Sequence, residues 1–341
     1  MPTSRDWTLL LQQPVSPAVT GRRLLLLTLL VALVSVGLVS YGSFPEMGRQ
    51  LAGFPVTHLL AALVLASLNY LLRFFRWAYY LRVLHIRVPF GLSALVFTSG
   101  LAMSVTPGKV GELLKSFLLR DRARVPVATS APVVLMERLT DLVSVVLLGL
   151  TGVALLPLPV SSVLGAVLLL VGGAMVVVVS RRGDRLFRLP FLRRWDRAIE
   201  ASREGLRLLT RPQVLLVAVA LGTVAWLSEG LALWVVLQGL DAEVALPRAL
   251  PIYAAATLVG ALSALPGGLV GTEGSIVVLL QQAGVARAAA SAGTLLVRLV
   301  TLGFAVAVGL AALAWLHRRQ PVVAASAPGG EPDGSVLQSP S

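Results

Sequence analysis

The sequence contains no cysteine and only three histidines. A disulfide framework and a thiolate metal site are therefore excluded, and the histidines are too scattered to match a metal-ligand spacing. We expect neither a metal nor a cofactor. Charge is scarce as well, because 13% of the 341 residues are charged whereas 56% are hydrophobic. A soluble globule needs more polar surface, so the composition predicts an all-α polytopic membrane protein.

Lysine is almost absent too. Only two of the 29 basic residues are lysines, Lys109 and Lys115, and the net charge is +13. In a membrane protein an arginine excess of this kind marks cytoplasmic loops that face anionic headgroups, so it does not require a nucleic-acid partner. We therefore expect membrane lipids, anionic or phosphate-bearing, as partners and no nucleic acid.

Long apolar runs alternate with arginine-rich segments, and this alternation predicts the topology. About six spanning helices are expected, in residues 24–41, from residue 59, and in 127–156, 160–180, 214–237 and 289–316. The other segments are a cytoplasmic N-terminal segment (1–23), a cytoplasmic loop with an amphipathic helix on the inner leaflet (181–211) and a disordered C-terminal tail (320–341). Both termini are then cytoplasmic.

Two Pro-Gly breaks interrupt the apolar sequence. The helix-breaking residues are Pro107 and Gly108 in the first break, and Pro266, Gly267 and Gly268 in the second. A Pro-Gly pair ends the preceding helix, and proline suits the first turn of the next one. The breaks predict two re-entrant hairpins, Phe90–Leu119 and Pro251–Gln282. Such broken backbone is tolerated only where protein or a wet cavity surrounds it.

The two breaks belong to a weak internal repeat. In order, Trp77, Leu84, Val88, Pro107 and Arg138 align with Trp234, Leu240, Val244, Pro266 and Arg298 at offsets between 156 and 160. The repeat units span about 57–156 and 213–316. An odd number of crossings between their starts inverts the second unit, as in secondary transporters whose site lies where broken helices meet. An old duplication that serves packing alone is the alternative, because small residues at the breaks also permit close packing.

Several charged residues lie within apolar sequence, where each charge costs at least about 2.5 to 3.5 kcal/mol without compensation. A helix that starts after each break offers free N–H groups to an anion, and a lipid phosphate is the natural anion. Candidate phosphate contacts are Arg73, Arg76, Lys109, Lys115, Arg138 and Arg298. Candidate proton carriers or orienting groups are Glu112, Glu137, Asp141 and Glu273. Structural salt bridges are the rival explanation, because Glu112 and Lys115, like Arg138 and Asp141, are spaced i, i+3.

Together these motifs resemble the transmembrane family of lysylphosphatidylglycerol synthase, also called flippase-like integral membrane proteins. The resemblance rests on Arg73 to Trp77, Pro107 to Glu112 with Lys115, Glu137-Arg138 with Asp141, and Pro266 to Gly274. It implies a flippase-like domain over residues 24–319 of a bacterial or archaeal cytoplasmic membrane protein. Two-part members also carry a soluble aminoacyl-transferase domain. Only about two dozen polar residues follow Arg319, so we do not expect synthase activity from this chain.

The resemblance and the charge pattern predict a lipid translocator that moves a phospholipid or a polyprenyl-phosphate-linked lipid between leaflets. Two other functions fit the same pattern: a membrane-embedded transferase acting on lipid headgroups, and the membrane subunit of a separately encoded synthase. The sequence shows neither a metal-ligand cluster nor a Ser/His/Asp arrangement, which disfavours an enzyme.

Overall fold

A computed structural model describes residues 44–106, 111–152, 196–263 and 265–318, together with nine isolated positions: 37, 41, 158, 162, 165, 166, 169, 170 and 173. Every regular element within these ranges is a helix, which confirms the all-α class. The expected segments 1–23 and 320–341, most of 24–41 and 160–180, and the residues Pro107, Gly108 and Lys109 lie outside the described residues.

Three helices in the described ranges are long and apolar enough to cross a membrane. They are α4 (Val56–Val83), α11 (Pro212–Gly239) and the continuous helix Arg287–Arg318. The last consists of α14 (Arg287–Arg298), a π-helical turn (Leu299–Gly303) and α15 (Phe304–Arg318). A fourth expected span forms α7 (Val127–Leu150), whose middle carries Glu137, Arg138 and Asp141. The chain is a polytopic helical membrane protein.

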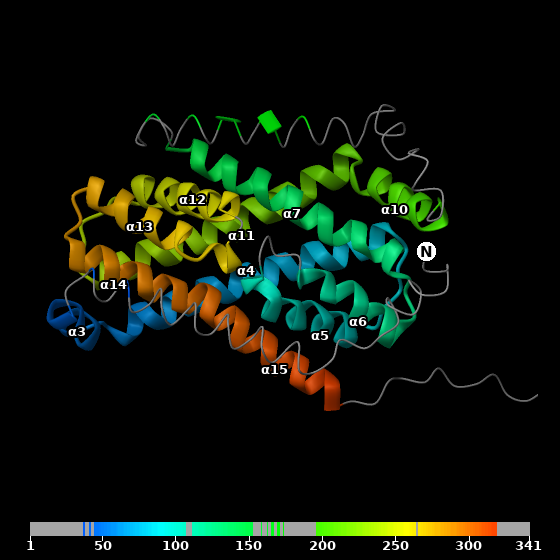
Figure 1. The fold of residues 1–341 in the computed structure, drawn as a ribbon, viewed down its shortest axis with the longest axis horizontal. Coiled ribbons are helices and arrows are strands. Elements are labelled where there is room, and N and C mark those ends of the chain that lie inside the picture. Colours follow the sequence, from blue (N-terminus) through cyan, green and yellow to red (C-terminus); the bar gives the residue numbers. More distant parts are fainter. Residues whose placement is uncertain are drawn as a thin grey trace, which may run out of the picture.

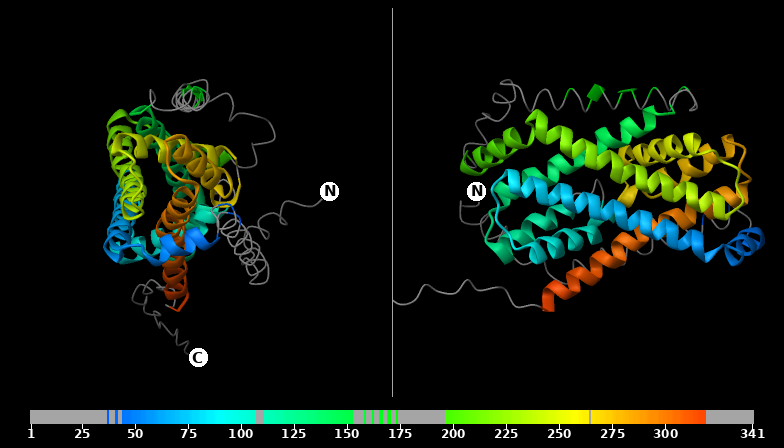
Figure 2. Two further views of the ribbon diagram at one scale, coloured as in Figure 1. Left: turned by 90° about the vertical axis from the view of Figure 1, so that its left-hand side faces the viewer. Right: turned by 180° about the vertical axis from the view of Figure 1, so that it is seen from behind.

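Helices α4 and α11 run antiparallel and pack side by side along one face of the molecule, which is nearest the viewer in the right-hand view of Figure 2 and at the back in Figure 1. Asn69 Nδ2 of α4 donates a hydrogen bond to the Ala225 carbonyl of α11 at 2.8 Å. Near the end of α11, Gly239 lies against His58 from the first turn of α4. At Gly222 a Cβ would lie 2.7 Å from Arg76 Nη1, so the missing side chain makes room for a guanidinium between the helices.

Each of these two long helices is followed by a pair of shorter helices. In the first pair, α5 (Phe90–Leu101) continues into a 3₁₀ turn (Ala102–Val105), and α6 (Leu114–Ala123) packs beside α5. In the second pair, α12 (Leu246–Leu262) is followed by a 3₁₀ turn (Pro266–Gly268) and by α13 (Gly271–Gln282). The same order of elements therefore occurs twice. The antiparallel course of α4 and α11 is the one that an inverted repeat predicts, and membrane re-entry of the pairs stays a prediction.

The second pair begins earlier than expected. Helix α12 starts at Leu246 rather than at Pro251. Pro247 falls in the first turn, whose N–H groups have no partner within the helix, so a proline costs little there. Pro251 lies inside the helix. Another helix, α3 (Phe44–Ala52), forms where we expected no element and packs on α14, with Met47 buried.

The two units exchange packing partners. The α5 helix and its 3₁₀ turn pack on α15, and α12 packs on α7 (Figures 1 and 2). Both contacts rely on glycine: Gly309 of α15 faces the backbone of Ala102, and Gly152 just after α7 faces Pro251. Each short-helix pair is therefore held by the last long helix of the other unit.

The amphipathic helix expected within 181–211 is α10 (Asp196–Leu209). It packs on α7, where Leu206 and Leu209 are buried and Ser202 Oγ donates a hydrogen bond to the Ala128 carbonyl at 2.8 Å. These two apolar residues are buried within the protein, so they are not free to enter the inner leaflet.

The glycine contact between α15 and the 3₁₀ turn yields a stability prediction. In Gly309→Ala the new methyl group would collide with the Ala102 backbone, which cannot rotate away. We expect the free energy of unfolding to fall by about 1–3 kcal/mol, as in other overpacked cores. Gly274→Ala in α13 is the matched control, because nothing lies within 4 Å of a Cβ there. Thermal unfolding in detergent should separate the two variants, and equal stability would contradict the close packing.

Candidate functional site

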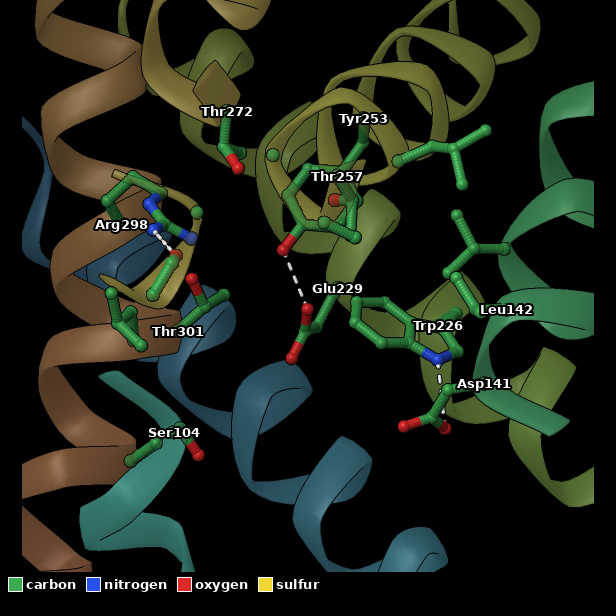
Figure 3. Close-up of a pocket in the computed structure, with 18 of the residues that line it drawn as sticks. Ser104, Asp141, Leu142, Trp226, Glu229, Tyr253, Thr257, Thr272, Arg298 and Thr301 are labelled. Carbon is green, nitrogen blue, oxygen red and sulfur yellow. Dashed lines mark hydrogen bonds between the residues drawn. The ribbon is translucent and has the colours of Figure 1, made fainter. Parts of the chain in front are cut away.

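A cavity of about 280 Å³ lies between the two units (Figure 3). Residues from α4, α7, α11 and α12, from the Pro266–Gly268 turn and from the π-helical turn all line it. Among the described residues, its basic lining side chains are Arg73, Arg138 and Arg298, and its acidic ones are Asp141 and Glu229. Most of the remaining lining residues are apolar or carry hydroxyl groups. The cavity thus combines a few charges with a largely apolar wall.

The α4 helix directs three polar side chains toward α7 and α11. Asn69, Arg73 and Arg76 are spaced i, i+4 and i+7, so they share one helix face, and all three are buried. Arg73 and Arg76 were both predicted as phosphate contacts, and of these two Arg73 lines the cavity.

Asp141 is the centre of the first charge cluster. Its Oδ1 lies 2.5 Å from Arg76 Nη2 and accepts a hydrogen bond from Trp226 Nε1 at 3.2 Å. Its Oδ2 lies 3.0 Å from Arg138 Nη2 and 3.9 Å from Arg73 Nη2. Asp141 therefore links three arginines from two helices, and the predicted i, i+3 pair with Arg138 is formed.

Glu112, which follows the first break, binds the same Arg138. Its Oε2 lies 3.0 Å from Arg138 Nη2 and 3.3 Å from Lys115 Nζ. Lys115 Nζ in turn lies 2.5 Å from Glu137 Oε2. The first cluster thus joins Glu112, Lys115, Glu137, Arg138 and Asp141 across α6, α7 and the turn before α6.

Lys115 is enclosed on every side that the structure describes. Its ammonium lies 4.9 Å from the centroid of the Trp77 ring and 5.3 Å from that of Phe97. A Cβ on Gly100 would lie 2.5 Å from Lys115 Cγ, so this glycine leaves the channel for the lysine stem. Neither Lys115 nor the fully buried Arg76 lines the cavity. These two cations neutralise buried carboxylates, which is the role that the salt-bridge explanation assigned to such residues.

The second charge cluster contains a glutamate–arginine ion pair, as the first one does. Arg298 Nε lies 2.5 Å from Glu273 Oε1, and Arg298 Nη2 donates a hydrogen bond to the Gly267 carbonyl at 2.7 Å. Gly267 and Gly268 have φ of 62° and 68°, a left-handed backbone that glycine adopts readily. In each unit, therefore, the glutamate after the break pairs with the arginine on the last long helix. The repeat alignment had matched these two arginines, and the structure supplies their partners.

Sequence reasoning missed a third feature of the cavity. Glu229 of α11 accepts a hydrogen bond from the Tyr253 hydroxyl at 2.6 Å. The Tyr70 hydroxyl of α4 donates a hydrogen bond to the Thr301 carbonyl at 2.5 Å. This carbonyl lies in the π-helical turn, where the regular α-helical hydrogen bonds are interrupted. Glu229 could have been found from the sequence, because it is the one charged residue in the apolar helix α11. An uncompensated charge there is as unfavourable as at the other charged positions within apolar sequence.

The arginines that line the cavity keep part of their donor capacity for a ligand. The side chains of Arg138 and Arg298 remain 19% and 15% exposed, although both are paired with carboxylates. Arg138 Nε is buried and has no hydrogen-bond acceptor among the described residues. A buried donor without a partner costs about 1–3 kcal/mol. An arginine fork also matches the geometry of a phosphate.

Two comparisons relate the chain to known proteins. The model of the family described as "Lysylphosphatidylglycerol synthase TM region" matches residues 24–309. A "UPF0104 membrane protein" of Methanothermobacter thermautotrophicus is 25% identical over 122 residues. The aligned segment spans 36% of this chain and 36% of that relative.

The enclosed pair of Lys115 and Glu137 yields a second prediction. Lys115→Met removes the cation beside the buried Glu137 carboxylate, so we expect a loss of about 3–5 kcal/mol in the free energy of unfolding. Lys115→Met/Glu137→Gln should recover most of that loss, because no uncompensated charge is left. Thermal unfolding of both variants in detergent measures the difference. A single variant as stable as the unmodified protein would show that the pair is dispensable.

Proposed function

We propose that this chain, which belongs to the lysylphosphatidylglycerol synthase TM region family, moves a phosphate-bearing lipid between the two leaflets of the membrane. The lipid is a phospholipid or a polyprenyl-phosphate-linked lipid. The membrane is the cytoplasmic membrane of a bacterium or archaeon, and both termini face the cytoplasm.

One observation carries the proposal: Arg138 from the first unit and Arg298 from the second line the same cavity and are still partly exposed. Arg73 also lines it. A volume of about 280 Å³ lies near the lower limit of ligand pockets, which range over about 300–1,000 Å³. The cavity therefore suits a headgroup, whereas the acyl chains would stay among lipids.

The arrangement of the two units supports transport by alternating exposure of this site. In the proposal the two short-helix pairs re-enter the membrane and the second unit is inverted, as in carriers with a site between broken helices. The antiparallel course of α4 and α11 and the exchanged packing of α5 on α15 and α12 on α7 are consistent with such rocking. Glu112 and Glu273 would hold Arg138 and Arg298 in place while the cavity is empty and release donors to an entering phosphate.

The description of the family favours a second candidate. Because it refers to the transmembrane region of a synthase, this chain is alternatively the membrane subunit of a separately encoded lipid-modifying transferase. Liposomes that contain labelled lipid separate the two candidates, because leaflet exchange and a new lipid product are measured in one sample. Product formation that requires an added soluble partner, without exchange, would favour the second.

Arg298 provides the sharpest functional prediction, because it forms an ion pair with Glu273 and the pair can be removed together. Loss of a charge-assisted phosphate contact costs about 1.5–3 kcal/mol, which corresponds to roughly 10- to 100-fold slower exchange. We expect this loss in Arg298→Gln and also in Arg298→Gln/Glu273→Gln. The double variant should be at least as stable as the single variant, because it leaves no stranded charge.

Arg120→Gln is the matched control, because Arg120 pairs with Asp121 on the surface of α6 and does not line the cavity. Its exchange rate should equal that of the unmodified protein. If the double variant regained normal exchange, Arg298 would serve only to neutralise Glu273, and the phosphate contact would be refuted at this position.

A further inference from the structure

Glu229 and Tyr253 line the cavity and have no part in the phosphate contacts proposed above. The Glu229 carboxylate is on α11, and Tyr253 is on α12 (Figure 3). Glu229 is 7% exposed, and its Oε2 accepts the Tyr253 hydroxyl hydrogen at 2.6 Å. A carboxylate therefore borders the space that a lipid phosphate would occupy.

We propose that Glu229 binds a proton when a phosphate enters the cavity, so that the headgroup and the proton occupy the site together. This inference rests on the proposed function and adds a co-substrate to it. A singly charged phosphodiester and one proton carry no net charge. Transport of the pair responds to a pH gradient, and its movement transfers no charge across the membrane potential.

Repulsion between two anions provides the driving force. A sphere with the cavity volume of about 280 Å³ is about 8 Å across, and two unit charges at that distance repel each other at an effective dielectric constant of about 20. This repulsion favours the neutral carboxylic acid by roughly 30-fold. Glu229 therefore gains a proton more readily when the phosphate is present.

The other carboxylates near the cavity lie beside cations. Glu112, Asp141 and Glu273 lie 3.0 Å, 2.5 Å and 2.5 Å from an arginine nitrogen, and Glu137 lies 2.5 Å from the Lys115 ammonium. The hydrogen bond that Tyr253 donates to Glu229 at 2.6 Å comes from a neutral phenol.

The groups around Glu229 couple it to the ligand. Among the described residues, six titratable or charged side chains line the same cavity as Glu229: Tyr70 and Arg73 of α4, Arg138 and Asp141 of α7, Tyr253 of α12 and Arg298 of α14. The charges of α10 are remote, because this helix precedes the start of α11 and Glu229 lies about 25 Å further along. A phosphate that contacts Arg73 and Arg298 offsets the positive field that otherwise favours ionised Glu229. Phosphate binding and protonation therefore assist each other.

Proton uptake on binding tests this inference. The full chain in detergent is titrated with a short-chain phosphatidylglycerol by calorimetry, in buffers that differ in ionisation enthalpy, across the neutral pH range. We expect uptake of up to one proton per bound lipid in the unmodified protein, and almost none in Glu229→Gln. Glu204→Gln, which alters an exposed acid of α10, is the control and should take up as many protons as the unmodified protein.

Tyr253→Phe provides a second variant whose result does not depend on the folding of Glu229→Gln. It removes a hydrogen bond that favours the ionised carboxylate, so the pH of half-maximal uptake should rise. Binding without proton uptake in the unmodified protein would overturn this inference and leave the proposed function standing. Uptake that persists in a folded Glu229→Gln protein would overturn the assignment to Glu229. Absence of any lipid binding would contradict both this inference and the proposed function.

Discussion

Buried charge inside apolar helices is the constraint on which this structure depends. Each charged side chain in a membrane interior must be compensated, and Asp141 and Glu112 do this by sharing Arg138 between them at 3.0 Å. The same demand explains why Gly222 and Gly100 carry no side chain, because Arg76 and Lys115 fill the space beside them. A network of this kind is weak evidence for stability, since replacing it by apolar residues often stabilises a protein. In the proposed function, the network is retained because a phosphate uses the same charges.

The sequence predicted the helical class, three of the long apolar helices and the break at Pro266 to Gly268, because hydropathy and Pro-Gly pairs act locally. It also predicted the i, i+3 pairs of Arg138 with Asp141 and of Glu112 with Lys115. It could not predict the partner of Arg298, because Glu273 lies on another helix and only the packing of α13 against α14 brings the two together. Nor could spacing reveal which cations line the cavity.

Whether a cation is enclosed between helices or lines the cavity depends on its position rather than on its residue type. Arg76 and Lys115 lie between packed helices, where Arg76 pairs with Asp141 and where carboxylates and aromatic rings enclose Lys115. Arg138 and Arg298 reach the cavity from equivalent places in the two units. Each of the latter is held by the glutamate that follows the break in its own unit. In the proposed function, a phosphate competes with these glutamates for the arginine donors, first in one unit and then in the other. The proton that Glu229 takes up would then balance the charge that the phosphate brings.

The central claim is that Arg138 and Arg298 bind one lipid phosphate between the two units. The most direct test is a cryo-electron microscopy structure of the protein in nanodiscs that contain phosphatidylglycerol. The account predicts headgroup density in the cavity, with the phosphate within hydrogen-bond distance of at least one of these arginines. An ordered lipid bound only at the outer surface of the helices, with both arginines still paired to Glu112 and Glu273, would contradict it.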